Sequence, residues 1–591
     1  MRVSGAARGR AVGTVLALVV ALAAAGAPTG ADPQESIASG SDRPAADRIS
    51  PRVRAERIDT VFADLARPGW PGCAVAVVQD GRTIHARGYG LASLEHQVPI
   101  RPDTVFDIAS VSKQFTAASI VLLAIENRLS LDDTIAKHVP EMAATGRGVT
   151  LRQLLHHTGG LRDYLSLLVL AGLEERGVST PADALAILAR QKGVNFPPGT
   201  DYQYCNSGFF LMSEVVRRVT GSSLALFAQE RIFDPLGMRS TRFLEDQTLP
   251  VPRRATGYSA AGEDGFRIDM SQYEQIGDGA VVTTVEDLAR WDANFYDPKV
   301  GGPALLDRLQ APGSLADGTA LHYGLGLSVD TFRGLRRVRH SGSWAGYRAE
   351  MARYPDERLS VICLCNLADA APRLRAEKLA AIVLGNRLAP EAAPGEGQVG
   401  TDSAGAGALP APGVPPVPDT LLGGFRDSRS GEIVSLRHDG SVLRLADWGD
   451  EAEVVVRGVD RLAVPEWGEE IQIVPAAGGT PPRLIINGRS ARPQTFEKYD
   501  PVGLTPARMR EYAGRYYCDE IEASLVLAIE KDLLVLRLPR RNDAAPLRPA
   551  IRDVFEGGEV VLQFDRDASR RITGLGLTTD GARNLRYVRR G

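Results

Sequence analysis

Short apolar runs in the first two thirds of the chain predict β-strands that pair with one another. A run at 73–78 is followed by Asp80-Gly81 and by a second strand-like stretch from residue 83. Asp-Gly suits the left-handed positions of a tight turn, so these runs predict a β-hairpin. Gly-rich or Pro-Asp turns separate three later runs of strand composition, which cover residues 336–340, 348–354 and 359–364.

Two helical patterns accompany these strands. Residues 115–123 are apolar nearly all round, which predicts a helix buried inside the domain. Residues 374–388 predict a helix that closes the domain. Strands at both ends with helices between them indicate an α+β domain over residues 55–388, in which helices pack on an antiparallel sheet.

The pattern changes beyond this domain. Residues 389–418 are rich in Pro, Ala and Gly and lack aromatic side chains, which is typical of a linker. Short alternating strands then recur over residues 419–500 and 501–591. We therefore predict two small antiparallel β-barrels or sandwiches, one in each of these ranges.

Weak internal similarity links these two β-rich segments. Leu443-Arg444-Leu445 is matched 93 residues later by Leu536-Arg537-Leu538. Asn487-Gly488 is matched by Asp580-Gly581 at the same spacing. These matches favour a repeated unit, although a chance echo is the alternative because the matches are short.

The amino-terminal segment has the pattern of an export signal. A cationic start precedes an apolar run over residues 11–25, and small residues follow. Ala25-Gly26-Ala27 and Thr29-Gly30-Ala31 are candidate cleavage sites, and the proline between them favours the second. We predict a signal peptide over 1–31, a flexible segment over 32–54, and a secreted or periplasmic protein, with an uncleaved anchor as the alternative. No later run is predicted to span a membrane.

Composition narrows the range of partners. The net charge is −3, from 69 basic and 72 acidic residues, so neither nucleic acid nor an anionic membrane is an expected partner. The cysteines form an odd, scattered set without zinc-ligand spacing, which favours buried packing residues over a disulfide framework. They are Cys73, Cys205, Cys363, Cys365 and Cys518.

One lysine stands out in a chain with seven lysines and 62 arginines. Lys113 follows Ser110 by three residues at the start of the predicted buried helix, so its amine would lie beside the hydroxyl. Burial can make a lysine neutral, whereas arginine keeps its proton and cannot act as a base. Ser110 is therefore a candidate nucleophile, although a surface Ser and Lys would give the same short pattern.

Two further motifs strengthen this interpretation. Tyr204 and Asn206 lie in a predicted loop. A tyrosine phenolate near a cationic lysine can serve as general base, and an asparagine amide can hold both the lysine and a substrate carbonyl. His340-Ser341-Gly342-Ser343 ends a predicted strand. Its glycine allows close approach of a substrate, and the next N–H can complete an oxyanion hole with that of Ser110. Each motif alone is weak, but the three in this order are a strong signal.

With these motifs the chain resembles the serine β-lactamase and penicillin-binding protein superfamily. It is most similar to class C β-lactamases, carboxypeptidases, D-aminopeptidases and related esterases. Ser110-x-x-Lys113, Tyr204-x-Asn206 and His340-Ser341-Gly342 match the three motifs of that group. The supporting stretches are 154–161, 277–288 and 323–326.

The resemblance implies a fold and a set of roles. The expected fold is an antiparallel sheet with helices on both faces, followed by two lipocalin-like barrels. Ser110, Lys113, Tyr204 and His340 are the implied catalytic residues, with either Lys113 or Tyr204 as the base. Asn206, Gly342 and Ser343 are implied to bind substrate or the oxyanion, and neither a metal nor a cofactor is expected.

One departure from the family pattern affects the expected substrate. Many members have lysine, which binds a carboxylate, at the position of His340, and a histidine is mostly neutral at pH 7. Efficient β-lactam hydrolysis is therefore less expected than cleavage of a small amide, peptide or ester, such as a D-amino-acid peptide or amide. A non-catalytic binder of ligands or cell-wall fragments on the same scaffold is the alternative. Aminopeptidase, carboxypeptidase and esterase activities are not distinguished.

Other residues receive structural interpretations. His156 and His157 have no third ligand at metal-binding spacing, so we expect loop or core histidines. Cys205 lies inside the second motif without an acid or histidine nearby in sequence, so we expect it to pack. We also hypothesise that one trailing β-unit folds back over the cleft and narrows the choice of substrate.

Overall fold

The structure is a computed structural model that describes residues 50–590 apart from 174–176, 263–264, 391–416, 466, 489–491 and 541–543. The predicted signal peptide, nearly all of the 32–54 segment and nearly all of the linker lie outside the described residues. The first helix, α1 (Pro51–Val61), begins inside the segment that was expected to be flexible. No helix within the described ranges is both long and apolar enough to span a bilayer.

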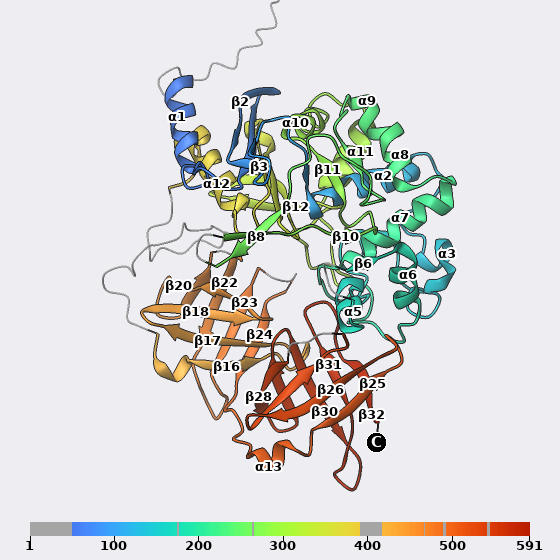
Figure 1. The fold of residues 1–591 in the computed structure, drawn as a ribbon, viewed down its shortest axis with the longest axis vertical. Coiled ribbons are helices and arrows are strands. Elements are labelled where there is room, and N and C mark those ends of the chain that lie inside the picture. Colours follow the sequence, from blue (N-terminus) through green and yellow to red (C-terminus); the bar gives the residue numbers. More distant parts are fainter. Residues whose placement is uncertain are drawn as a thin grey trace, which may run out of the picture. The chain divides into compact units, whose positions relative to one another are not determined.

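A six-stranded antiparallel sheet organises residues 51–388 (Figure 1). This part is called the hydrolase domain below, after the family that its motifs resemble. The strand order is β12-β13-β14-β15-β1-β2, so the first strands of the domain pair with its last. The bounds are β12 (Ser328–Phe332), β13 (Leu335–Trp344), β14 (Tyr347–Tyr354), β15 (Leu359–Cys365), β1 (Cys73–Gln79) and β2 (Arg82–Tyr89). The predicted hairpin is confirmed, with φ of 52° at Asp80 and 73° at Gly81.

Helices cover both faces of this sheet, as expected. Alternate residues of β15 enter different cores, because successive strand side chains point to opposite faces. Ile362 and Leu364 join a core with α10 (Val285–Ala293), whereas Val361 and Cys363 join a core with α12 (Pro372–Leu384).

The predicted central helix is confirmed as α2 (Lys113–Ile125), whose residues 113–123 are all buried. Such burial on every side explains its nearly uninterrupted apolar sequence. Other helices of this domain are α4 (Leu151–Leu155), α5 (Tyr164–Leu170), α6 (Pro181–Ala189), α7 (Asn206–Thr220), α8 (Leu224–Ala228) and α11 (Gly302–Gln310).

The cysteine prediction was wrong in part. Cys73 and Cys365 form a disulfide that joins β1 to β15 across a sequence separation of 292 residues. Cys363 is buried beside them, and its sulfur lies 3.7 Å from that of Cys365. Each cysteine fits an apolar strand by itself, so only the strand pairing reveals the covalent partner.

Two β-units follow the hydrolase domain (Figure 1). The first is a nearly closed sheet of nine strands, and the second is a closed eight-stranded barrel. The first unit contains β16 (Gly423–Arg426), β17 (Ile433–Asp439), β18 (Val442–Asp447), β19 (Asp450–Glu453), β20 (Val455–Val456), β21 (Arg461–Val464), β22 (Glu469–Val474), β23 (Arg483–Asn487) and β24 (Gln494–Lys498). The barrel contains β25 (Gly514–Cys518), β26 (Ala523–Glu530), β27 (Leu533–Arg537), β28 (Ala545–Ile551), β29 (Val554–Gly557), β30 (Val560–Arg566), β31 (Ile572–Thr578) and β32 (Leu585–Arg590).

Candidate active site

Ser110 lies in a strained turn directly before α2. A short strand, β5 (Phe106–Asp107), leads into a 3₁₀ turn over Ala109–Ser112, and Lys113 is the first residue of α2. Ala109 has φ of 47°, a left-handed value that costs energy for a residue with a side chain. The Asp107 carboxylate accepts a hydrogen bond from the Ala109 N–H at 2.8 Å and stabilises this turn. The turn holds Ser110 at the cavity wall.

The Lys113 amine is buried at the centre of the site. Its Nζ lies 3.0 Å from Ser110 Oγ, 2.9 Å from Asn206 Oδ1 and 2.6 Å from the Asp278 carbonyl oxygen. Lys113 is 0% exposed. The first two motifs predicted from the sequence therefore meet at this nitrogen, together with a residue that the motifs did not include.

Burial lowers the pKa of Lys113 to about 8, although the negative charges of Asp278 and Asp163 oppose this shift. About a tenth of the amine is then neutral at pH 7. The amide oxygen of Asn206 and the carbonyl of Asp278 can only accept hydrogen bonds, so a neutral Lys113 donates its two hydrogens to them. Its lone pair then faces the hydroxyl of Ser110, which is the geometry of a general base.

Tyr204 forms the wall above this amine. The Lys113 nitrogen lies 4.9 Å from the centre of the Tyr204 ring, and Asn206 begins α7 two residues later. Tyr204 exposes 37% of its surface, yet the desolvating surroundings raise the pKa of its phenol well above the usual value. A hydrogen bond with Ser110 opposes that rise only in part. The phenol is therefore protonated at neutral pH and can donate a hydrogen bond.

Both ring nitrogens of His340 are already engaged by the protein. Its Nδ1 lies 2.6 Å from the Ser341 carbonyl oxygen, and its Nε2 lies 2.9 Å from the Tyr323 hydroxyl. A carbonyl oxygen accepts only, so Nδ1 carries the hydrogen and Nε2 accepts from Tyr323. Burial, helped by the charge of Lys113, lowers the pKa of His340 to about 3. The ring is neutral and gives no positive charge for a substrate carboxylate.

The third motif places an open strand edge beside Ser110. A Cβ on Gly342 would overlap the Ile108 carbonyl group and lie 3.2 Å from the Ala109 Cβ, so only glycine fits. β12 pairs with β13 no further than Arg339. The backbone of Ser343 beyond that point lines the cavity without a neighbouring strand on that side among the described residues.

A cavity of about 520 Å³ brings these groups together. Ser110, Tyr204, Asn206, Gly342 and Ser343 line it, with Lys113 buried beneath Ser110. Aromatic side chains form much of the remaining wall, as is usual for small-molecule sites. They are Tyr164, Tyr202, Tyr273, Tyr323 and Trp344.

Sequence reasoning missed a pair of buried acids behind the motifs. Asp278 accepts a hydrogen bond from the Tyr164 hydroxyl at 3.0 Å, and burial raises the pKa of its carboxyl to about 6. Asp163 accepts a hydrogen bond from the Asn206 N–H at 2.5 Å. Asp278 lies within a stretch that supported the resemblance, whereas Asp163 carried no sequence signal beyond its place before an apolar helix.

The neighbouring histidines and Cys205 have packing roles in the structure. His156 and His157 are 8% and 2% exposed, and the His157 ring lies 4.3 Å from that of Tyr204. The Nδ1 of His157 accepts from the Cys205 N–H at 3.1 Å. Burial raises the pKa of the Cys205 thiol to about 12, so the thiol stays protonated and is not a nucleophile.

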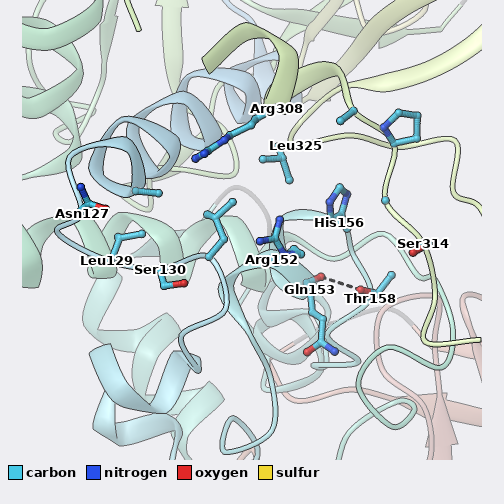
Figure 2. Close-up of a pocket in the computed structure, with 15 residues that line it drawn as sticks. Asn127, Leu129, Ser130, Arg152, Gln153, His156, Thr158, Arg308, Ser314 and Leu325 are labelled. Carbon is cyan, nitrogen blue, oxygen red and sulfur yellow. Dashed lines mark hydrogen bonds between the residues drawn. The ribbon is translucent and has the colours of Figure 1, made fainter. Parts of the chain in front are cut away.

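A second cavity of about 610 Å³ lies apart from the candidate active site (Figure 2). Its lining includes Arg152, His156 and Arg308, but neither Ser110 nor Lys113. Arg152 is already paired with Asp132 through two hydrogen bonds. Size alone therefore does not identify the site of chemistry, whereas the convergence of motifs does.

Comparisons with known proteins show the family to which the chain belongs. A family model described as Beta-lactamase matches residues 58–385. D-aminopeptidases from Cereibacter sphaeroides and Brucella anthropi are 32% and 30% identical over 459 and 539 residues, covering 77% and 88% of this chain and 81% and 95% of theirs. A penicillin-binding protein homologue from Pyrococcus abyssi, described as octameric, has a similar fold, with a TM-score of 0.52 at 21% identity over 76% of this chain and all of that one. The chain is therefore a serine hydrolase that belongs to the β-lactamase and penicillin-binding protein superfamily, in the branch of the D-aminopeptidases.

Proposed function

We propose that the protein cleaves the amide bond of a small peptide or amide carrying a D-amino acid, through an acyl-enzyme on Ser110. The observation that carries this proposal is the hydrogen bonding of the buried Lys113 amine. Two of its partners, the Asn206 amide oxygen and the Asp278 carbonyl, can only accept hydrogen bonds, whereas the Ser110 hydroxyl can donate one. A protein that only binds ligands has no need of such an amine, so the arrangement favours an enzyme over a binder.

The proposed acylation step uses the groups at the cavity wall. Ser110 Oγ bonds to the carbonyl carbon while its proton moves to Lys113 Nζ. The N–H groups of Ser110 and Ser343 hold the oxygen as it becomes negative. The C–N bond then breaks, and the leaving amine takes a proton from the protonated phenol of Tyr204, which Lys113 replenishes. A water molecule then attacks the carbonyl carbon of the Ser110 ester and gives a proton to Lys113 Nζ. The bond between that carbon and Ser110 Oγ breaks, and Ser110 Oγ takes the proton back from Lys113.

The electrostatics of the cavity support an amide without an essential carboxylate. His340 is neutral and Lys113 is enclosed, so neither offers an accessible charge to a carboxylate. Arg339, a cation on the cavity wall, is already paired with Asp330. The D-aminopeptidase name of the relatives supports a substrate that has a D-residue with a free amino group. We infer that β-lactams are poor substrates for the same reason.

An adjoining cavity extends this proposal to the β-units. It measures about 610 Å³ and shares Leu165, Tyr273 and Trp344 with the catalytic cavity. Its other wall includes Asp450 of the first unit and Glu559 of the barrel. We propose that these units restrict the substrate and that their carboxylates favour a cationic amino end.

Export is part of the proposal. The amino-terminal pattern predicts a signal peptide, and the Cys73–Cys365 disulfide is typical of an oxidising compartment. Mass spectrometry of the mature protein from the periplasm or medium tests this. A new amino terminus near residue 32 with the disulfide intact is expected, and an unprocessed protein that stays in the cytoplasm would contradict it.

The function is tested by turnover of matched D- and L-alanine amides, a simple aryl ester and a chromogenic cephalosporin. D-alanine amide is expected to be preferred over its enantiomer, with little turnover of the cephalosporin. A fluorophosphonate should label the wild type on Ser110 and leave Ser110→Ala unlabelled. Labelling that survives this substitution, or binding without turnover over the whole panel, would overturn the proposal.

A further inference from the structure

The turn between β31 and β32 of the barrel is bonded directly to the hydrolase domain. The Gly581 carbonyl accepts hydrogen bonds from the Asp163 N–H at 2.8 Å and from Asn195 Nδ2 at 3.1 Å. Asn195 Oδ1 in turn accepts from the Arg583 N–H at 2.8 Å. The backbone of the turn is therefore held at its tip and on one flank by the Asp163 N–H and the Asn195 side chain.

A second contact of this turn reaches the segment that carries Tyr204. The Gln203 amide donates to the Asp580 carbonyl and accepts from Asn195 Nδ2, the latter at 2.9 Å. Gln203 is the residue before Tyr204, and its N–H donates to the His157 carbonyl at 3.1 Å. Gln203, which precedes Tyr204 of the second motif, is thus held between the barrel turn and the loop that contains His157.

Asp163 links the barrel turn to the catalytic amine of Lys113 through Asn206. Its backbone donates to Gly581, while its carboxylate accepts from the N–H groups of Asn206 and Leu165 at 2.5 and 3.0 Å. Asn206 accepts from Lys113 Nζ through its side chain. A continuous path of hydrogen bonds therefore joins the barrel turn to the amine beside Ser110.

The fit at the tip of the turn leaves no space for a side chain. A Cβ on Gly581 would lie 2.7 Å from the Asp163 Cβ and closer still to the Ser166 hydroxyl. A Cβ that is not bonded to these atoms essentially never comes so close to them, so an alanine at position 581 must push the turn and Asp163 apart. The φ of Gly581 is outside the left-handed region, so the strain of an alanine would come from this contact alone.

The flank of the turn is anchored by a buried ion pair. Arg162 donates to the Glu520 carboxylate at 2.8 Å, with side chains 4% and 5% exposed. Arg162 also donates to the carbonyls of Arg583 and Asn584 at 3.3 and 3.4 Å. The residue before Asp163 is therefore fixed to the barrel as well, which limits how far Asp163 can move independently.

We propose that this turn, residues 579–584, is a positioning element of the active site, which sets the place of Asn206 and Tyr204 against Ser110. The proposal rests on the acyl-enzyme function proposed above. The barrel then acts in acylation through Asp163, separately from any part it takes in lining the substrate cavity. Displacing the turn should slow the chemical step while changing substrate affinity little.

Gly581→Ala in the full-length protein tests this proposal, with Gly503→Ala as the matched control. A Cβ at Gly503 meets nothing within 4 Å, and Gly503 lies outside the left-handed region. With D-alanine p-nitroanilide, Gly581→Ala should lower kcat by at least about tenfold with KM changed by less than about threefold, since misplacement of reacting groups acts on the rate. The control should stay within about twofold of the wild type on the same argument.

Fluorophosphonate titration separates slow chemistry from loss of folded protein. The proposal predicts that kcat per labelled Ser110 falls in Gly581→Ala, whereas mere instability would lower the labelled fraction and leave kcat per site unchanged, which would overturn it. If Gly581→Ala does not fold, Asn195→Ala removes the flanking bonds without a clash and should lower kcat per site in the same way. A wild type that neither turns over nor labels would instead refute the proposed function.

Discussion

The first β-unit encloses its own core, whereas the barrel shares one with the hydrolase domain. Phe425, Leu484 and Phe496 of the first unit belong to a cluster confined to that unit. Leu562 and Tyr587 of the barrel belong to the same cluster as the helices around Ser110. Two units with a similar sequence pattern therefore differ in how they pack: the first has a core of its own, and the barrel extends the core of the hydrolase domain.

Their polar contacts with the hydrolase domain differ in the same sense. The barrel is joined by the buried Arg162–Glu520 pair. The first unit is joined by Arg492 and Asp317, whose side chains are 36% and 54% exposed. Exposed pairs contribute little, whereas breaking a buried pair is costly. One β-unit can therefore support the active site while its neighbour remains peripheral.

The largest expected effect comes from Lys113→Ala, because the hydrolase domain supplies the general base of the reaction. Loss of a general base lowers rates by about 10²–10⁴-fold. Among the described residues, no other lysine lines the catalytic cavity. Steady-state kcat with D-alanine p-nitroanilide measures the effect. Activity within about tenfold of the wild type would place the base elsewhere.

Removing one partner of each ion pair contrasts the two docking surfaces. Arg162→Ala leaves Glu520 buried without its cation and should cost about 3–5 kcal/mol of stability. Arg492→Ala should cost less than about 1 kcal/mol, because its pair is exposed. Denaturant unfolding followed by fluorescence gives both values. Equal costs would mean that the two units dock alike.

Matched core substitutions ask which unit supports the active site. Leu562 and Leu484 are both fully buried, so each change to alanine should cost about 2–5 kcal/mol. Only Leu562→Ala is expected to lower the temperature at which activity is lost, since its core continues into the hydrolase domain. Thermal inactivation measured beside thermal unfolding of each variant decides this. If Leu484→Ala lowers the inactivation temperature as much as Leu562→Ala does, the barrel does not support the active site more than the first unit does.

A smaller effect concerns pH. Asp278 holds a negative charge near Lys113 and so raises the pKa of that amine, against the larger effect of burial. Asp278→Asn removes the charge, so the neutral amine should form at lower pH and the alkaline rise in kcat/KM should move to lower pH. Leu562→Ala, which is remote from this charge, serves as the control for general damage. An unchanged profile in Asp278→Asn would contradict this electrostatic account.

Features that depend on residues close together in the chain could be predicted from the sequence. The spacing of Ser110 and Lys113 predicted a shared helical face, and the surrounding apolar residues predicted the burial that the structure confirms. The hairpin at Asp80-Gly81 and the strands β13 and β14 followed from turn chemistry and strand composition. These features depend on residues close together in the chain, which is why pattern and propensity captured them.

What the sequence did not reveal depends on distant pairing. Cys73 and Cys365 looked like ordinary strand residues until β1 was seen beside β15. Asp163 caps α5, and its contact with Gly581 spans more than four hundred residues. Such contacts leave no local pattern, because either partner alone satisfies a simpler structural explanation.

The pH dependence of acylation tests the central claim most directly, namely that a neutral Lys113 takes the proton of Ser110. Burial lowers the pKa of Lys113 to about 8, so the charged form predominates below that pH and the neutral base above it. The single-turnover rate with an aryl ester should therefore rise between pH 6 and 9 with a midpoint near 8, and this rise should vanish in Lys113→Ala. A rate that is flat over this range in the wild type, or a rise that persists without Lys113, would contradict the account.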